Sequence, residues 1–147
     1  MKRILVTAAG GGSGNNLVRG FRASRYPVYV VGTNIDKYYL ARSIADRNYL
    51  VPRGDAGEEY IQAIHDIVVA EGIDLVVANS DAEVGPISRH RHRFPASVFL
   101  PSFETIETCQ DKYSLYAHLT AHRFRVAETY EVGDGSQIDE IFARFEG

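Results

Sequence analysis

An apolar run that ends in a glycine-rich loop constrains this chain more than any other feature. Arg3 to Ala9 is nearly all apolar, which is typical of a strand buried on both faces of a parallel sheet. Gly10 to Gly14 contains four glycines and one serine, a composition that favours a tight loop. Residues 15–26 carry apolar side chains at helical spacing, and residues 28–34 indicate a second buried strand. This order of elements predicts a right-handed βαβ unit.

The same alternation continues along the chain. Gly57 to Gly72 is the clearest helix, because its apolar residues form one stripe and glutamates stand near its N-terminus. Gly72 is expected to end it, since glycine is common just after the last helical residue. Together these segments predict an α/β fold with a doubly wound, mostly parallel sheet. We expect further strands at residues 48–52, 73–80 and 98–101, and further helices at 36–46, 81–93 and 111–123. Asp111 is the expected N-cap of the last of these helices.

The pattern changes after Arg123. Residues 126–132 alternate as a half-exposed strand does, and residues 136–147 have the apolar spacing of an amphipathic helix. One strand and one helix cannot bury their own apolar faces. We therefore expect residues 1–123 to form one domain and residues 124–147 to begin a second, α+β domain that is truncated here. Packing of this segment against the first domain is the alternative.

Charge and composition restrict the partners. With 16 basic and 19 acidic residues, the net charge of −3 supplies no general attraction for nucleic acid. No run approaches the roughly 18 apolar residues of a membrane span, and the N-terminal run is too short for a signal peptide. One cysteine excludes an internal disulfide framework. We expect a cytoplasmic protein without membrane or nucleic-acid partners, and nothing here excludes a homodimer.

The glycine-rich loop is the first candidate site. Backbone amides at a strand–helix junction can bind an anion, so Gly10, Gly11, Gly12, Ser13, Gly14 and Asn15 are candidate ligand contacts. The dinucleotide fingerprint G-x-G-x-x-G requires glycine at position 15, where asparagine stands. The longer spacing G-x-x-G-x-x-G requires glycine at position 8, which is alanine. A tight turn with close helix–strand packing is the alternative interpretation.

Acidic residues follow two other strands. Asp36 comes 22 residues after Gly14, where a dinucleotide-binding fold places the acid that binds ribose, or it caps the next turn. Ser80, Asp81 and Glu83 follow a later strand, and paired carboxylates there could hold an ammonium group or orient a base. Capping of the next helix is the alternative for this segment.

Histidine and lysine provide the remaining candidates. His90 and His92 stand among three arginines, which repel a divalent cation, and His118 and His122 lack the glutamate of an H-E-x-x-H arrangement. We therefore expect no metal ligands. The Arg-His run at 89–93 indicates a solvated helix end. Lys112 lies in the first turn of a predicted helix, where a cation opposes the helix dipole. A phosphate neighbour would favour lysine there, and an ordinary exposed lysine is the alternative.

Four segments together resemble a known family. They are RILVTAAGGGSGNNLVR, VGTNID followed by IADRNYLVP, LVVANSDAE, and LPSFETIETCQDKYSLYAHL, and they span residues 3–119. In order and spacing they resemble the N-terminal, Rossmann-like pre-ATP-grasp domain of ATP-grasp ligases, in particular the group similar to the large subunit of carbamoyl-phosphate synthase. Ala8 and Ala9 depart from the pattern, because glycine is common there.

The resemblance implies an ATP-dependent ligase that activates a carboxylate as an acyl-phosphate, which an amine, ammonia or thiol then attacks. It implies that Lys112 reaches the nucleotide phosphates. It further implies that ATP and magnesium are bound mainly by later domains, and that this chain holds no catalytic residue and is inactive alone. The expected partners are the remainder of the enzyme and a small-molecule carboxylate. The glycine loop, Asn34, Asp36, Ser80, Asp81 and Glu83 would lie on the substrate side.

Two other functions stay open at this point. A nicotinamide-binding oxidoreductase or epimerase is suggested by the near-match of the glycine loop and by Asp36. The Tyr-x-x-x-Lys pair of short-chain enzymes is absent, because no lysine has a tyrosine four residues before it. A non-catalytic module that binds a small ligand through the glycine loop is the third interpretation.

Overall fold

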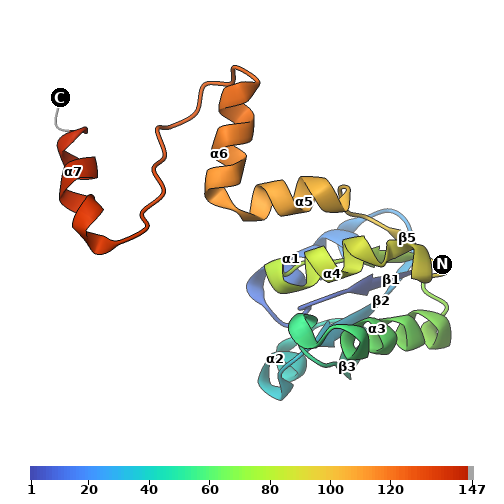
Figure 1. The fold of residues 1–147 in the computed structure, drawn as a ribbon. Helices are drawn as coiled ribbons and strands as arrows, with labels where there is room; N and C mark the ends of the chain where they lie inside the picture. The colour runs from blue at the N-terminus through green and yellow to red at the C-terminus, as the bar shows by residue number, and fades with distance from the viewer. Residues whose placement is uncertain (146–147) are drawn as a thin grey trace. The chain divides into compact units, whose positions relative to one another are not determined.

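The computed structural model describes residues 1–145, which fall into two compact units, the first being Met1–Ile106 and the second beginning at Glu107. The first unit is an α/β domain with a five-stranded, all-parallel sheet (Figure 1), which confirms the predicted fold class. The strand order is β3-β2-β1-β4-β5, so the chain reverses its direction of travel across the sheet between β1 and β4. The strands are β1 (Lys2–Val6), β2 (Val28–Asn34), β3 (Arg47–Leu50), β4 (Leu75–Val77) and β5 (Ser97–Val98).

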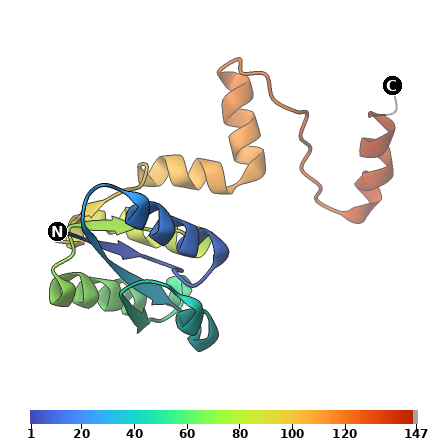
Figure 2. The ribbon, with the colours of Figure 1, turned by 180° about the vertical axis from the view of Figure 1, so that it is seen from behind.

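Helices cover both faces of this sheet. Helix α1 and helix α3 lie on opposite sides of the strands in both ribbon views (Figures 1 and 2). Successive residues of the central strands bury their side chains on alternate faces of the sheet. Because both faces are covered, the strands are continuous apolar runs. The helical segments of this part of the chain are α1 (Gly12–Ala23), α2 (Lys37–Arg42), α3 (Glu58–Glu71) and α4 (Asp81–Arg89), with short 3₁₀ turns η1 (Gly54–Ala56) and η2 (Arg91–Arg93).

Two hydrophobic clusters hold these layers together. On one face Val18 of α1 packs with Ile4 and Val30 of the central strands. On the other face the stripe of α3 and Ile87 of α4 pack against Leu5 and its neighbours. The predicted stripe is confirmed, since Tyr60, Ile61, Ile64, Ile67 and Val68 are all buried. Helix α3 ends at Gly72, whose φ of 57° is left-handed and favours glycine.

The C-terminal part differs from the expectation. It contains α5 (Phe103–Gln110), α6 (Lys112–Ala121), η3 (Gly135–Gln137) and α7 (Ile138–Ala143). The predicted strand at 126–132 is wrong, because these residues have no regular structure and no described strand pairs with them. Alternating side chains alone cannot form a strand, since its backbone groups need a neighbour. Asp111 caps α6 as expected, through a 2.6 Å bond from the Ser114 amide.

The assignment of residues 124–147 to a second domain stays a prediction, and the end of its predicted helix, residues 146–147, lies outside the described residues. No helix in the described part of the chain has the length and hydropathy that crossing a membrane requires.

Candidate functional site

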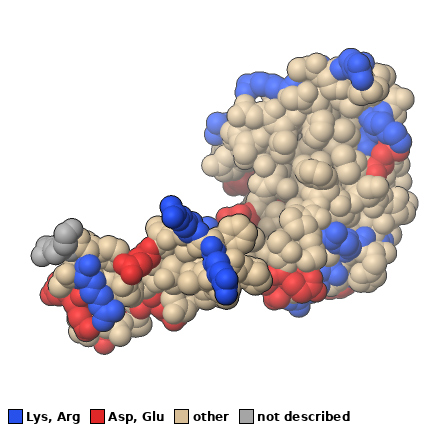
Figure 3. Space-filling model, turned by 90° about the horizontal axis from the view of Figure 1, so that it is seen from above, with Lys and Arg blue, Asp and Glu red and all other residues tan. Residues whose placement is uncertain are grey.

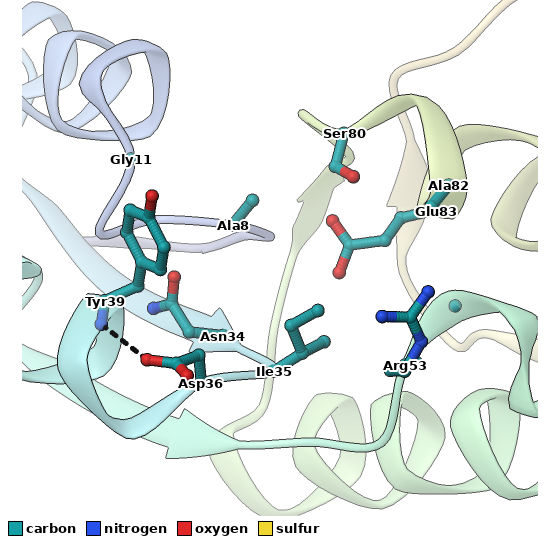
Figure 4. Close-up of a pocket in the computed structure, with 11 residues that line it drawn as sticks. Ala8, Gly11, Asn34, Ile35, Asp36, Tyr39, Arg53, Ser80, Ala82 and Glu83 are labelled. Carbon is teal, nitrogen blue, oxygen red and sulfur yellow. Dashed lines mark hydrogen bonds between the residues drawn. The ribbon is translucent and has the colours of Figure 1, made fainter.

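A cavity of about 330 Å³ opens at the carboxyl edge of the sheet (Figure 4). It lies where the strand order reverses between β1 and β4, the place where ligands bind in open α/β sheets. Five residues predicted from sequence line it: Gly11, Asn34, Asp36, Ser80 and Glu83. The other lining residues are Ala8, Ile35, Tyr39, Arg53, Gly54 and Ala82.

The glycine loop is shaped chiefly by packing. A Cβ on Gly10 would lie 1.7 Å from the carbonyl oxygen of Tyr39, and one on Gly14 would lie 2.4 Å from the carbonyl oxygen of Ala8. The Gly10 amide donates to Asn34 Oδ1 at 3.1 Å, so this amide is already occupied. Ala8 adopts a left-handed φ of 48°, which explains why glycine would suit this position. Only Gly11 of the loop glycines lines the cavity.

Ser13 and Asn15 make internal contacts rather than face the cavity. The side chain of Asn15 accepts from the Ile44 amide at 3.1 Å and donates to the Arg42 carbonyl at 3.2 Å. Ser13 Oγ accepts from Asn79 Nδ2 at 3.0 Å. Asparagine therefore stands at the last fingerprint position because it ties the start of α1 to the segment that follows α2.

Asp36 serves as the N-cap of α2. Its Oδ1 accepts from the amides of Tyr38 at 2.7 Å and Tyr39 at 3.3 Å. The capping contact that was one alternative is thus present, and the residue also lines the cavity. Asn34, the last residue of β2, is buried beside it and has an amide nitrogen without a hydrogen-bond partner among the described residues.

Glu83 is the most unusual group of the site. Its side chain is directed into the cavity from the first turn of α4 (Figure 4), yet the residue is only 3% exposed. Its Oε1 accepts from the Tyr60 hydroxyl at 3.0 Å, whereas its buried Oε2 has no hydrogen-bond partner among the described residues. Burial raises the pKa of Glu83, and the nearby hydroxyls of Thr7, Tyr60 and Ser80 oppose that rise. A buried acceptor without a partner is suited to a ligand.

Arg53 was not predicted from the sequence. It follows β3 and is the one cationic side chain among the residues that line the cavity. Its guanidinium contacts both carboxylate oxygens of Asp55, with Nη2–Oδ2 at 3.0 Å, and this hydrogen bond lowers the pKa of Asp55. Both side chains are exposed, so the pair is weak and a ligand anion could compete for the guanidinium. The sequence feature that could have identified Arg53 is its position shortly after a strand, the same criterion that selected Asp36.

Several candidates lie elsewhere. Asp81 is exposed at the start of α4 and does not line the cavity. Lys112 is the exposed first residue of α6, and its contact with phosphates stays a prediction. In the Arg-His run, Arg91 donates to the Leu100 carbonyl at 3.3 Å and Arg93 pairs with Glu58 at 2.7 Å, so these arginines stabilise the fold.

Metal-ligating side chains give no further site in the described part of the chain. No group of three or more His, Cys, Asp or Glu in residues 1–145 lies close enough together to hold a metal ion. On the face shown in Figure 3, basic and acidic side chains are interspersed among the described residues.

Comparisons with known proteins agree with this picture. Residues 4–99, about two thirds of the chain, match the family model described as PylC-like, N-terminal domain. A structure of glycinamide-RNase-transformylase T from Mycobacterium tuberculosis has 14% identity and a TM-score of 0.64, and the match covers 95% of this chain and 38% of that one. At this identity the likeness concerns the fold alone. No curated protein matches the sequence.

A weaker likeness is to dTDP-glucose 4,6-dehydratase from Bacillus anthracis str. Ames, whose structure is described as a complex with NAD. The identity is 13% and the TM-score 0.45, with 67% of this chain and 37% of that chain covered. A likeness at this level supports no conclusion about fold or function. The chain spans less than two fifths of the length of either structure.

Proposed function

Because this chain belongs to the family of PylC-like N-terminal domains, which are N-terminal domains of ATP-grasp ligases, we propose that it lines the substrate side of an ATP-dependent carboxylate–amine ligase. In the proposed reaction the substrate carboxylate attacks the γ-phosphorus of ATP and releases ADP. An amine then attacks the acyl-phosphate carbon, loses a proton and displaces phosphate, which leaves an amide. The observation that carries the proposal is the cavity at the carboxyl edge, within the segment that matches the family.

The lining of the cavity supports a small ligand with two polar ends. Arg53 offers a guanidinium that can exchange Asp55 for the carboxylate of a ligand. Glu83 offers a buried oxygen that can accept a hydrogen bond from an amine. The N-terminus of α1, with Gly11 at the cavity wall, adds a positive dipole end. These groups would bind and orient the substrate.

The same lining does not suit ATP with magnesium. One cation, Arg53, stands against the carboxylates of Asp36 and Glu83, whereas phosphoryl transfer requires several positive charges around the γ-phosphate. The described residues also contain no cluster of potential metal ligands. We therefore assign the binding of ATP and its magnesium ions mainly to other domains of the enzyme, with Lys112 reaching the phosphates. We assign no catalytic group to this chain.

The test is ADP formation by the full product of the gene with each of the twenty amino acids as carboxylate and with amino acids or ammonia as amine. We expect at least one pair to release ADP. For that pair, Arg53→Ala should raise the KM for the carboxylate about tenfold without changing the KM for ATP. The matched control is Arg25→Ala, which removes an exposed arginine outside the cavity.

Three results would count against the proposal. One is the absence of ADP release with every pair. Another is micromolar binding of NADH without any effect of ATP on thermal stability, which would favour the oxidoreductase interpretation. The third is binding of a metabolite by the protein without ATP consumption, which would favour the small-ligand module.

A further inference from the structure

Tyr60 does not line the cavity, but it contacts Glu83, which does. It is the third residue of α3, is 0% exposed, and belongs to a core cluster whose other members are apolar. Its hydroxyl donates to Glu83 Oε1 at 3.0 Å, across 23 residues of sequence. Phenylalanine would fill the same space in the core, so packing alone does not account for the hydroxyl.

The hydrogen bond makes the two oxygens of Glu83 different. Oε1 is occupied by Tyr60, while Oε2 is buried and has no hydrogen-bond partner among the described residues. The backbone that carries Glu83 is held as well, since a Cβ on Gly54 would lie 2.3 Å from the Ala82 carbonyl oxygen. The close approach of η1 fixes the start of α4, and Tyr60 fixes the end of the side chain.

We propose that Tyr60 is a positioning residue: its hydroxyl anchors Oε1 of Glu83, which keeps Oε2 turned to the cavity and available to an N–H group of the ligand. This inference rests on the proposed function, in which Glu83 binds the substrate. Tyr60 acts through Glu83 and does not itself touch the ligand.

The arrangement also controls the charge of Glu83. Tyr60 faces it from α3, the hydroxyls of Thr7 and Ser80 lie nearby, and Arg53 and Asp36 line the same cavity. Burial raises the pKa of Tyr60 as well, so its hydroxyl stays a neutral donor. A donor to the ionised form stabilises that form, and therefore loss of the Tyr60 hydroxyl should raise the pKa of Glu83 further.

The first experiment follows the Glu83 carboxyl carbon by NMR during a pH titration of glutamate-labelled protein. Its signal is identified by its loss in Glu83→Gln. We expect Tyr60→Phe to move the Glu83 titration to higher pH. The matched control, Tyr29→Phe, removes a hydroxyl from a half-buried tyrosine beside the core and should leave it unchanged. An unchanged Glu83 titration in folded Tyr60→Phe protein overturns the inference.

A second measurement does not depend on folding of that variant. In wild-type protein the Tyr60 ring carbon that carries the hydroxyl should shift at the pH where Glu83 titrates, and this step should vanish in Glu83→Gln. A Tyr60 signal that is flat through the Glu83 titration overturns the inference equally.

The availability of Oε2 is tested with methylammonium as the probe. At neutral pH we expect a saturable shift of the Glu83 signal and of the cavity amides in wild-type protein, and no shift of those amides in Glu83→Gln. Binding in Tyr60→Phe should be about tenfold weaker, as expected for loss of a hydrogen bond to a charged group, and should recover towards higher pH. A wild-type protein without a Glu83-dependent response overturns the inference, whereas the ADP assay decides the proposed function separately.

Discussion

Replacing each of two glycines of α1 by alanine should have opposite effects on the stability of the protein. Gly14 and Gly20 lie six residues apart in one helix, and alanine favours a helix interior over glycine by about 1 kcal/mol. At Gly20 no heavy atom lies within 4 Å of an added Cβ. At Gly14 the Cβ would lie 2.4 Å from the Ala8 carbonyl oxygen and 2.7 Å from Ala9 Cα.

The loss of stability expected for Gly14→Ala depends on which atoms must move to make room for the added Cβ. The atoms that a Cβ on Gly14 meets belong to the backbone between β1 and α1, so no flexible side chain can give way. The start of α1 would have to shift by about 1 Å to restore ordinary contact, which pulls Val18 from its buried place on the sheet. Overpacking costs about 1–3 kcal/mol, and because the clash is with backbone atoms we expect the upper part of that range, about 2–3 kcal/mol. This exceeds the gain in helix propensity of about 1 kcal/mol by about 1–2 kcal/mol.

The assay is thermal unfolding followed by circular dichroism. For a unit of about 100 residues, 1 kcal/mol corresponds to about 4 °C in Tm. We expect Gly20→Ala to raise Tm by about 2–4 °C and Gly14→Ala to lower it by about 4–8 °C. A Gly14→Ala protein at least as stable as wild type would refute the conclusion that close packing sets the form of this loop.

Substitutions at three further residues test the burial of Glu83, the Tyr49–Glu71 hydrogen bond and the Asp36 cap. Burial raises the pKa of Glu83, so the folded protein loses stability as pH rises through that pKa. Calorimetry should therefore show a higher Tm for Glu83→Gln than for wild type at pH 8, with the difference shrinking towards pH 4. Equal Tm values at pH 8 would mean that the carboxylate is well solvated. The hydrogen bond from the Tyr49 hydroxyl is the main cause of the lowered pKa of Glu71, so the folded protein loses stability as pH falls through that pKa. Tyr49→Phe should therefore move acid unfolding to higher pH and cost about 1 kcal/mol of stability at neutral pH. An acid transition that circular dichroism shows to be unchanged would contradict this expectation. Asp36→Ala should cost about 1 kcal/mol in urea unfolding, whereas Asp36→Ser should retain most of the stability, and equal losses would argue against the cap.

The sequence was informative wherever the signal is local. The α3 stripe, the stop at Gly72 and the Asp111 cap depend on residues within one or two turns of each other, and all three are present. The strand expected at 126–132 failed for the complementary reason. Alternation describes side chains, whereas a strand exists only where a neighbour satisfies its backbone, and no described strand pairs with this segment.

The candidate site was predictable in position and less so in composition. The rule that ligands lie at the carboxyl ends of parallel strands selected Gly11, Asp36, Ser80 and Glu83, and the family resemblance added Asn34; these five line one cavity. The other substrate-side candidates do not line it: Gly10, Gly12, Ser13, Gly14, Asn15 and Asp81. Arg53 obeys the same rule and was overlooked, because the strand before it is short and Pro52 stands between that strand and Arg53.

The order of apolar runs, glycines and caps by itself determined that this chain forms alternating strands and helices around a buried parallel sheet, because each of those signals acts between neighbours in the chain. Only the tertiary structure decided which glycines are held by packing, which way Asn15 faces, and that Tyr60 meets Glu83. Apart from the contact of Gly14 with Ala8, those contacts join residues more than twenty positions apart. They depend on the strand order and on the space left between packed layers, which local spacing does not encode.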